Sequence, residues 1–478
     1  MSFADTLLWV IPELMLAVGA MGLLIAGVFM GDASSRLIST LSIALLIGAL
    51  MVVVFLNGGP PQDLFGGAFR VDAYSSFAKI LILAAAALAI LMSDKYLAGE
   101  QLGRFEYPVL IVLAALGMSM MVSANDLIAL YLGVEMQSLA LYILAAFNRD
   151  SRRSTEAGLK YFVLGALSSC LLLYGASLIY GFAGSTQFDA IASTLSGDPN
   201  IGLVIGLVFL ISGLAFKVSA APFHMWTPDV YEGAPTPVTA FFAAAPKLAA
   251  MALFARAMIS PFEAVTDEWR PIIAILSVAS MAVGAFSAIV QTNIKRLMAY
   301  SSIGHMGFAL IGLAAGTTQG VGAVLVYMAI YVAMTVGAFA CILLMRRRGG
   351  MTESIDDLAG LTKTNPGLGL ILTVLLFSLA GVPPMAGFFG KLFVFLAAVD
   401  AGMVWLAVVG AVMSVVSAYY YLRIIWIMWF NEAAPVFERE VGSRLGVTAF
   451  VSAALMLLSL PFLGLLLKSA QAAAASLF

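Results

Sequence analysis

Long apolar runs follow one another along the chain, separated by short polar connections. About fourteen of them, each roughly 20 residues or more, are long enough to cross the hydrocarbon layer of a membrane as helices. They lie at 4–29, 37–57, 73–93, 105–123, 126–147, 155–182, 201–231, 236–259, 271–291, 296–315, 319–345, 366–399, 402–429 and 445–468. The longest polar connections have room for a short helix and for no separate soluble domain. The pattern predicts an all-α polytopic membrane protein.

The composition supports this reading. Of the 478 residues, 62% are hydrophobic and 10% are charged, whereas about 25% are charged in soluble domains. Cys170 and Cys341 both lie in apolar runs, and we expect them to be small buried hydrophobes rather than a disulfide or metal ligands. No cysteine cluster and no GxGxxG motif after a strand is found, so we expect no iron–sulfur, flavin or nicotinamide site.

The basic residues predict how the chain is oriented. Successive connections between spans lie alternately on the two sides of the membrane. The connections on one side carry fifteen lysines and arginines, and those on the other side carry four. The first set is Arg36, Lys95, Arg104, Arg149, Arg152, Arg153, Lys295, Arg296, Arg346, Arg347, Arg348, Lys363, Arg423, Arg439 and Arg444. Short loops rich in basic residues usually lie on the cytoplasmic side of the membrane. With an even number of spans, both termini are then predicted to lie on the opposite side.

Two of the predicted spans, 201–231 and 366–399, are interrupted by proline near a lysine. Pro222 follows Lys217 by five residues, and Pro383 shortly precedes Lys391. Proline frees backbone carbonyls that only a protein-lined or watery cavity can satisfy. A lysine at membrane depth costs about 2.5–3.5 kcal/mol on insertion scales. Both costs on one helix indicate a working site.

The positions of the two broken spans predict an internal repeat. They are the seventh and the twelfth, and segments displaced by an odd number of spans run through the membrane in opposite senses. Spans four to eight and nine to thirteen would therefore form an inverted repeat of five helices, as in many transporters. The expected units are a three-helix segment over 1–104, two antiporter-like halves over 105–260 and 261–430, and a C-terminal helix over 431–478.

Several ionisable residues lie inside predicted spans. They are Lys79, Lys160, Lys217, Lys247, Lys391, Glu13, Glu135 and His305. Such residues are rare in spanning helices and commonly mark proton relays or ion pathways. The alternative is a set of static ion pairs that fixes helix packing. The number of lysines, spread over several spans, favours the relay.

The individual residues differ in what they predict. Glu135 is expected to approach Lys217, so that moving a neighbouring charge can switch the lysine between charged and neutral. Lys247 follows a proline in mid-span, and His305 is a residue type that shuttles protons. Lys160 lies close enough to an arginine cluster to extend to the membrane surface instead. The same extended pose is expected for Lys79, which has no evident partner.

Three long motifs resemble those of a known family. They are Phe216 to Pro228 followed by Tyr231 to Pro237, then Lys295 to His305, and Gly381 to Lys391. Over nearly the whole chain, the sequence is similar to the proton-antiporter-type membrane subunits of respiratory complex I.

That resemblance implies a subunit that moves protons across a bacterial inner membrane, with both termini on the periplasmic side. Electrons would pass from NADH to quinone in partner subunits, which would hold the NAD, FMN, iron–sulfur and quinone sites, and this chain would bind none of them. Its partners would be other membrane subunits, including sister antiporter-like ones. The proton-relay residues implied are Glu135, Lys160, Lys217, Lys247, His305 and Lys391.

Within the family, one antiporter-like type has a glutamate where this chain has Lys391, and another has a long lateral helix for which this chain is too short. The resemblance therefore favours the third type. Subunits of multisubunit sodium/proton antiporters also keep a lysine there and are the first alternative. A structural spacer of the membrane arm, with buried charges that only fix helix packing, is the second.

Overall fold

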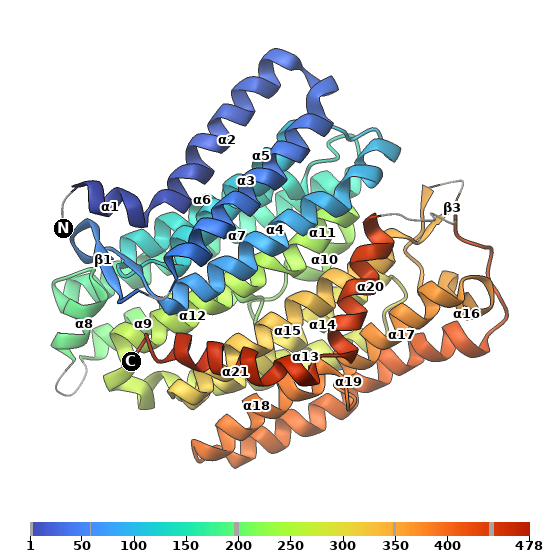
Figure 1. Cartoon of the computed structure of the whole chain (residues 1–478). Coiled ribbons are helices and arrows are strands. Elements are labelled where there is room, and N and C mark those ends of the chain that lie inside the picture. Colours follow the sequence, from blue (N-terminus) through green and yellow to red (C-terminus); the bar gives the residue numbers. More distant parts are fainter. Residues whose placement is uncertain (1–2, 58, 196–199, 348–349, 439–443) are drawn as a thin grey trace.

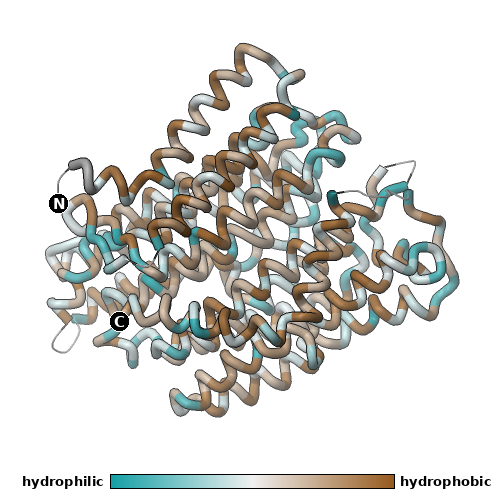
Figure 2. Tube along the Cα trace, in the orientation of Figure 1, coloured by the Kyte–Doolittle hydropathy of each residue, from teal (hydrophilic) through white to brown (hydrophobic). Residues whose placement is uncertain are grey.

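The structure is a computed structural model that describes residues 3–57, 59–195, 200–347, 350–438 and 444–478. It is a bundle of helices that run between two opposite ends (Figure 1). Figure 2 shows hydrophilic residues gathered mainly at those two ends and hydrophobic residues along the helices between them. The predicted all-α polytopic membrane protein is confirmed.

The N-terminal part consists of helices around a small hairpin. The elements are α1 (Phe3–Trp9), α2 (Ile11–Met30), α3 (Ser35–Leu56), β1 (Gln62–Leu64), β2 (Phe69–Val71) and α4 (Ala73–Gly99). The two strands pair antiparallel. Asp72 caps the start of α4: its side chain accepts from the backbone N–H of Ser75, and the Ser75 hydroxyl accepts from the backbone N–H of Asp72. This capping box satisfies two backbone donors and sets the start of the helix.

The next part contains the first broken helix. Its elements are α5 (Glu106–Val122), α6 (Leu127–Ala145), α7 (Arg152–Ala183), α8 (Phe188–Thr194), α9 (Ile201–Val218), α10 (Thr227–Gly233), α11 (Thr236–Ala243) and α12 (Ala245–Phe262). The predicted break in 201–231 separates α9 from α10. The predicted span 236–259 is also divided, at Ala244. Pro246 has no N–H to donate back across that joint, so a new helix begins there.

The second half repeats this arrangement of a broken helix among continuous ones. Its elements are α13 (Thr266–Ile289), α14 (Ile294–Ala315), α15 (Thr318–Leu343), β3 (Arg346–Arg347), β4 (Gly350–Met351), α16 (Leu361–Thr364), α17 (Pro366–Ala380), α18 (Ala386–Asp400) and α19 (Val404–Phe430). Helices α14 and α15 are almost completely enclosed by the others. The break between α17 and α18 confirms the one predicted in 366–399.

The C-terminal segment differs from its prediction. We expected one span over 445–468, but α20 (Arg444–Leu457) and α21 (Leu460–Ala474) meet at an angle of 85°. Pro461, at the second position of α21, lacks the N–H that would continue the helical ladder. After the bend, α21 packs across α15 and α4 (Figure 1).

Ten helices in the described part of the chain are long and apolar enough to cross a membrane, or eleven if the bent pair α20–α21 is one span. This number is lower than the predicted fourteen partly because some of the predicted spans contain helices that are too short to be counted alone. Helix α5 has 17 residues, and α17 and α18 have 15 each.

One end of the bundle carries most of the arginines, and we call it the arginine-rich end. Its ion pairs include Arg104 with Asp32, Arg153 with Glu232, and Arg346 with Glu100. Of the residues used for the orientation, Arg348 and Arg439 lie outside the described part. The first and last described residues of the chain both lie at the other end (Figure 1).

Two buried ion pairs involve the N-terminal part. Lys79 lies 2.7 Å from Glu13, with both side chains almost completely buried, so the expectation that Lys79 extends to the surface is wrong. Arg256 lies 2.7 Å from Asp72, and neither side chain is exposed at all. These pairs join α2 to α4 and α4 to α12. Cys170 also departs from its prediction, because it is exposed on α7, whereas Cys341 is buried as expected.

Replacing Glu13 by alanine is expected to destabilise the protein by about 3–5 kcal/mol, because Lys79 would remain buried without its counter-ion. Replacing both residues together, as Glu13→Leu and Lys79→Met, is expected to cost far less, since no charge is then left unpaired. Thermal unfolding of the two variants in detergent measures the difference. An equal loss in both variants would show that the pair stabilises the fold in its own right.

Candidate functional site

The break between α9 and α10 holds the first buried lysine. Lys217 lies in the last turn of α9 and donates a hydrogen bond to the Ser138 hydroxyl on α6, at 2.8 Å. Helix α9 ends because Ser219 adopts a left-handed conformation, with φ of 62°. The carbonyl of Phe216, in the last turn, accepts from the backbone N–H of Ser219 at 3.0 Å and also from the indole N–H of Trp226 at 3.1 Å.

The same break holds the second lysine. Lys247, in the first turn of α12, donates to the carbonyl of Val218 at 3.1 Å and also to the Ser219 hydroxyl. Its Nζ lies 5.1 Å from the centre of the Trp226 ring, within the range of a cation–π interaction. A backbone carbonyl and a serine hydroxyl at the break thus bind a lysine of α12.

His305 lies on α14 between two tyrosines. Its Nδ1 is 2.6 Å from the hydroxyl of Tyr327 on α15, and its Nε2 is 3.2 Å from the hydroxyl of Tyr421 on α19. The Tyr421 hydroxyl also bonds the hydroxyl of Ser301. Hydroxyl groups both donate and accept, so this chain of groups can pass a proton in either direction.

The second broken helix holds the last lysine. Lys391, on α18, donates to the carbonyl of Ala380 and to the Ser414 hydroxyl, both at 2.9 Å. The carbonyl of Ala380 is free because α17 ends at Gly381, whose φ is 84°. A Cβ at Gly381 would also lie 3.0–3.3 Å from the Lys391 side chain, so a glycine suits both the turn and the space. A cavity of about 290 Å³ between α17, α18 and α19 reaches Lys391.

The three lysines and the histidine share one kind of environment. Each is at most 7% exposed. Among the described residues, no carboxylate lies within ion-pair distance of Lys217, Lys247 or Lys391, and their hydrogen-bond acceptors are neutral hydroxyls and carbonyls. The contacts also refine the comparison of the two halves. Lys391 and Lys247 each bind a carbonyl at a helix break. Lys217 instead lies just before the break and binds a serine hydroxyl of another helix.

Glu135 and Lys217 were predicted to approach each other, and among the described residues no direct ion pair joins them. The half-buried Glu135 carboxylate accepts a hydrogen bond from Ser169 on α7, while Lys217 bonds Ser138, three residues further along α6. Residues three apart are neighbours on a helix surface, so the carboxylate and the lysine approach adjacent positions of α6.

Lys160 lies apart from the three buried lysines and His305. Its side chain is 41% exposed, and its Nζ is 2.8 Å from Asp229 and 2.8 Å from Glu156. This places it at the arginine-rich end, where the alternative reading had it. Asp229 lies on α10, the second part of the broken seventh span, so Lys160 still contacts the broken helix.

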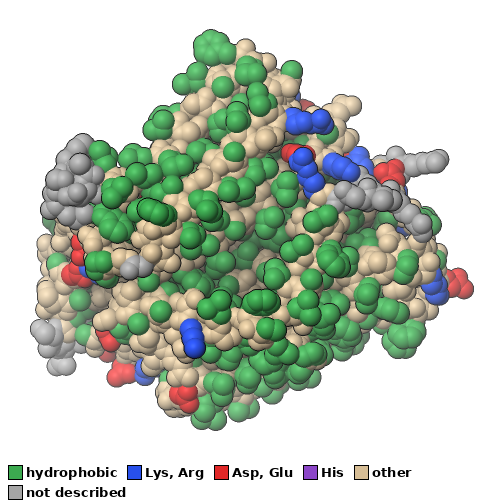
Figure 3. Space-filling model, viewed as in Figure 1, with side chains coloured by type: hydrophobic (Ala, Val, Ile, Leu, Met, Phe, Trp, Pro, Cys, Tyr) green, Lys and Arg blue, Asp and Glu red, His purple; other side chains and the backbone are tan. Residues whose placement is uncertain are grey.

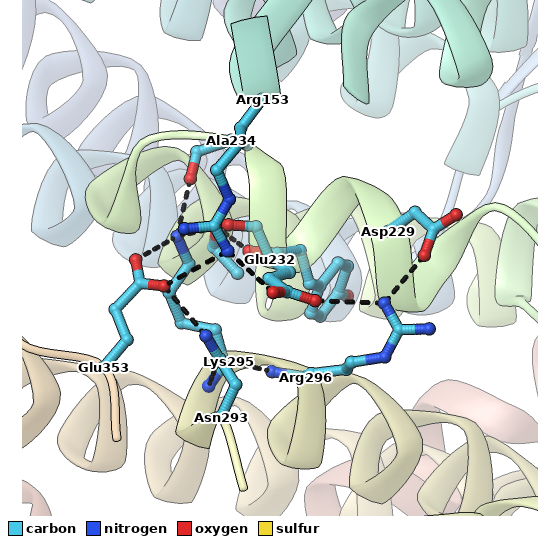
Figure 4. Close-up of polar contacts among 10 residues, drawn as sticks. Arg153, Asp229, Glu232, Ala234, Asn293, Lys295, Arg296 and Glu353 are labelled. Atoms are coloured by element: carbon cyan, nitrogen blue, oxygen red, sulfur yellow. Dashed lines mark hydrogen bonds and ion pairs between the residues drawn. The ribbon is translucent and has the colours of Figure 1, made fainter. Parts of the chain in front are cut away.

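Figure 4 shows a cluster of polar residues that the sequence did not predict as site residues. Arg296, at the start of α14, bonds both Asp229 and Glu232 of α10. The buried Lys295 donates to Glu353 at 2.9 Å and to two carbonyls at the end of α10, those of Glu232 and Ala234. Burial alone would raise the pKa of Glu353, but Lys295 and Asn293 outweigh it and hold that pKa below its ordinary value of 4.5. The cluster ties the broken helix of the first half to α14 of the second.

Replacing Glu353 by glutamine is expected to cost about 1.5–3 kcal/mol at neutral pH, the range for a hydrogen bond to a charged group. A lowered pKa in the folded state means that the carboxylate stabilises the fold above pH 4.5 and loses this effect as the pH falls further. Thermal unfolding of both proteins at several pH values tests this. A difference that does not shrink under acid conditions would contradict it.

Comparison with known proteins gives consistent matches. The family described as "NADH:quinone oxidoreductase/Mrp antiporter, TM" matches residues 124–417. The chain is 55% identical to NADH-quinone oxidoreductase subunit N of Paramagnetospirillum magneticum over 98% of this chain and 97% of the relative. It is similar to a chain of respiratory complex I from Thermus thermophilus, with a TM-score of 0.80 and 34% identity over 95% of this chain and 98% of that one. A chain of an archaeal membrane-bound sulfane sulfur reductase gives a TM-score of 0.84 and 26% identity, over 96% and 98%.

Proposed function

The chain belongs to the family of NADH-quinone oxidoreductase subunit N, and we propose that it carries protons through the buried row of Lys217, Lys247, His305 and Lys391. As a member it is a proton-translocating, antiporter-like membrane subunit of an enzyme complex, and other membrane subunits are its partners. The proposal concerns the path of the proton within this chain.

The observation that carries the proposal is how the three lysines are held. An amine hydrogen-bonded only to hydroxyls and carbonyls keeps those bonds whether or not it carries its extra proton, because both forms have N–H donors. A structural lysine in this protein is bound differently, as Lys79 is by Glu13. Lys217, Lys247 and Lys391 are therefore suited to take up and release a proton.

Contacts at the two ends of the row support its proposed order. Val218, next to Lys217, supplies the carbonyl that binds Lys247. At the other end, Phe308 of α14 lies beneath Lys391, with Nζ 4.7 Å from the ring centre, and His305 is one turn away on the same helix. Water must complete the path, since proton transfer needs hydrogen-bonded neighbours. Glu135 would bias Lys217 electrostatically, and Lys160 with Asp229 would act where protons enter.

We also propose the finer architecture that the sequence predicts. Fourteen spans result when α9–α10, α11–α12, α17–α18 and α20–α21 are each counted as one. The inverted repeat would then pair the run α5 to α12 with the run α13 to α19. In support, α5 packs on α6 as α13 packs on α14, and each run contains a helix broken beside a buried lysine. The domain boundaries predicted at 104, 260 and 430 follow from this repeat.

The proposed setting is the bacterial inner membrane, with the arginine-rich end in the cytoplasm and both termini in the periplasm. The NAD, FMN, iron–sulfur and quinone sites would lie in partner subunits, and sister antiporter-like subunits would be among the neighbours. The identity to subunit N relatives favours this role over a subunit of a sodium/proton antiporter.

Neutralising Lys217 tests the proposal. In membrane vesicles with Lys217→Ala, proton uptake driven by NADH oxidation is expected to slow by about 10²-fold, the lower end of what a positioned proton-transfer group contributes. Lys363→Ala, which removes an exposed lysine, is the control. A native gel confirms assembly. Normal uptake in an assembled Lys217→Ala complex would overturn the relay and favour the structural spacer.

A further inference from the structure

The interval between His305 and Lys391 has no polar side chains on the helix that carries the histidine. From Met306 to Ala315, no side chain of α14 contains nitrogen or oxygen. One turn beyond the histidine lies Phe308, whose ring centre is 6.4 Å from that of His305 and 4.7 Å from Nζ of Lys391. A phenyl ring neither takes up nor releases a proton, so the two ionisable groups need a connection on another helix.

Helix α19 has a hydroxyl group at each end of this interval. The Tyr421 hydroxyl lies 3.2 Å from Nε2 of His305, and the Ser414 hydroxyl accepts from Nζ of Lys391 at 2.9 Å. Residues seven apart on an α-helix lie on nearly the same face, about 10.5 Å apart along the axis. One face of α19 therefore contacts both of the groups that the row must connect.

Ser417 lies between these two residues on the same face. It is three residues from Ser414 and four from Tyr421, and residues at these spacings are neighbours on a helix surface, with Cβ atoms about 5–6 Å apart. The Ser417 hydroxyl donates to the carbonyl of Met413 at 2.8 Å, and its oxygen can still accept from another donor. One water between successive hydroxyls would complete a hydrogen-bonded chain.

These three residues, which we call the α19 hydroxyls, face the interior of the protein. Tyr421 is completely buried and Ser417 is 3% exposed, while Ser414 lines the cavity of about 290 Å³ that reaches Lys391. The opposite side of α19 is exposed and mainly apolar, with Val408, Val412, Val415 and Tyr419. Figure 3 shows hydrophobic side chains along the lower edge of the molecule, where α18 and α19 lie in Figure 1. The polar face of α19 is thus the one that faces the row.

We propose that the α19 hydroxyls pass protons from His305 to Lys391. The doubly protonated histidine gives its Nε2 proton to the Tyr421 oxygen while that hydroxyl releases its own proton to a water, so the tyrosine stays neutral. Ser417 and Ser414 orient the waters that carry the proton to the neutral amine of Lys391. This inference rests on the proposed function and names the groups that perform one of its steps.

Replacing Tyr421 by phenylalanine tests the inference, because the change removes one oxygen and keeps the ring. In vesicles that contain the assembled complex, proton uptake driven by NADH oxidation is expected to slow by about 10²-fold. The ratio of the uptake rates in light and heavy water is expected to rise, since proton transfer becomes the slow step. Tyr419→Phe makes the same change on the exposed side of α19 and is the control. An unchanged rate, or a slower rate with an unchanged ratio, would overturn the proposal.

The double variant Ser414→Ala with Ser417→Ala tests the same step if Tyr421→Phe does not assemble. Its proton uptake is also expected to slow, with the same rise in the ratio of rates, because the waters lose the hydroxyls that orient them. Ser469→Ala is the control, since Ser469 is exposed and its hydroxyl also donates to the carbonyl four residues earlier. Normal uptake in the assembled double variant would overturn the proposal.

Lys391→Met, measured beside these variants, separates this inference from the proposed function. Slow uptake in Lys391→Met with normal uptake in Tyr421→Phe would overturn the role of the α19 hydroxyls alone. Normal uptake in both variants would overturn the relay and this step together.

Discussion

Replacing Lys247 by arginine is expected to leave the complex assembled and to slow proton movement through this subunit by about 10²-fold or more. Arginine keeps a positive charge and several N–H donors, so it can still bind the carbonyl of Val218 and the hydroxyl of Ser219 and lie against the Trp226 ring. It does not release its proton in proteins. The substitution thus preserves the charge and the packing role while removing the ability to pass a proton.

This variant distinguishes the two readings of the buried lysines. If Lys247 only fixes the broken helix, arginine should preserve proton uptake in vesicles; if it relays, uptake should be lost. The longer side chain costs about 1–3 kcal/mol if the site cannot expand, so assembly must be checked on a native gel. Lys363→Arg provides the matched control, because that lysine is exposed.

A second variant, Lys247→Met, tests the same residue if the arginine variant does not assemble. Lys247→Met removes the charge with little change in volume and leaves no ion unpaired, since no carboxylate faces Lys247 among the described residues. We expect it to assemble and to lose proton uptake as well. An assembled Lys247→Met complex that pumps normally would exclude this residue from the path.

Much of the fold could be predicted because the bilayer constrains it. Apolar runs of the length of a span leave little choice but helix, and the described helices fall close to the predicted runs. The breaks at Pro222 and Pro383 could be predicted because proline interrupts a helix at its own position. The bend between α20 and α21 was missed although Pro461 was a local signal, because the apolar run continues across it.

The site was less predictable because its contacts depend on helix rotation and depth. Lys217, Lys247 and Lys391 stood out as lysines in apolar runs. Their partners did not, since serines such as Ser138 and Ser414 are common in spanning helices. Whether Glu135 meets Lys217 depends on how α6 is turned, and whether Lys79 extends to the surface depends on Glu13 of another helix. Neither can be derived from spacing within one helix.

The tyrosines beside His305 illustrate the same limit. Tyr327 lies on α15 and Tyr421 on α19, and the two tyrosines are almost a hundred residues apart in the chain. Each is one aromatic residue among many in an apolar helix, where packing is the ordinary role. Only the packing of both helices against α14 makes them hydrogen-bond partners of a histidine. The structure thus supplies what the sequence lacks, which is the set of groups between the ionisable residues.

At Lys391, the last lysine of the row, the amine can be replaced by a carboxylic acid, which also binds and releases a proton. Lys391→Met is expected to slow proton uptake by about 10²-fold, as for any lost proton-transfer group. Lys391→Glu should retain more uptake than methionine, because a carboxylic acid also binds and releases a proton. Its protonated form can donate to the carbonyl of Ala380 or to Ser414, which bind the lysine in the native chain. The shorter side chain faces a cavity of about 290 Å³ that gives room for water to bridge the difference.

The comparison of the two variants carries the argument, since both remove the lysine and its positive charge. A structural role for the charge of Lys391 predicts that glutamate is the more damaging substitution, because it places an acceptor beside the carbonyl of Ala380. A relay predicts the reverse order. Proton uptake in vesicles, normalised to the amount of assembled complex, therefore decides between them by the sign of the difference: glutamate above methionine supports proton transfer at Lys391, and methionine equal to or above glutamate contradicts it.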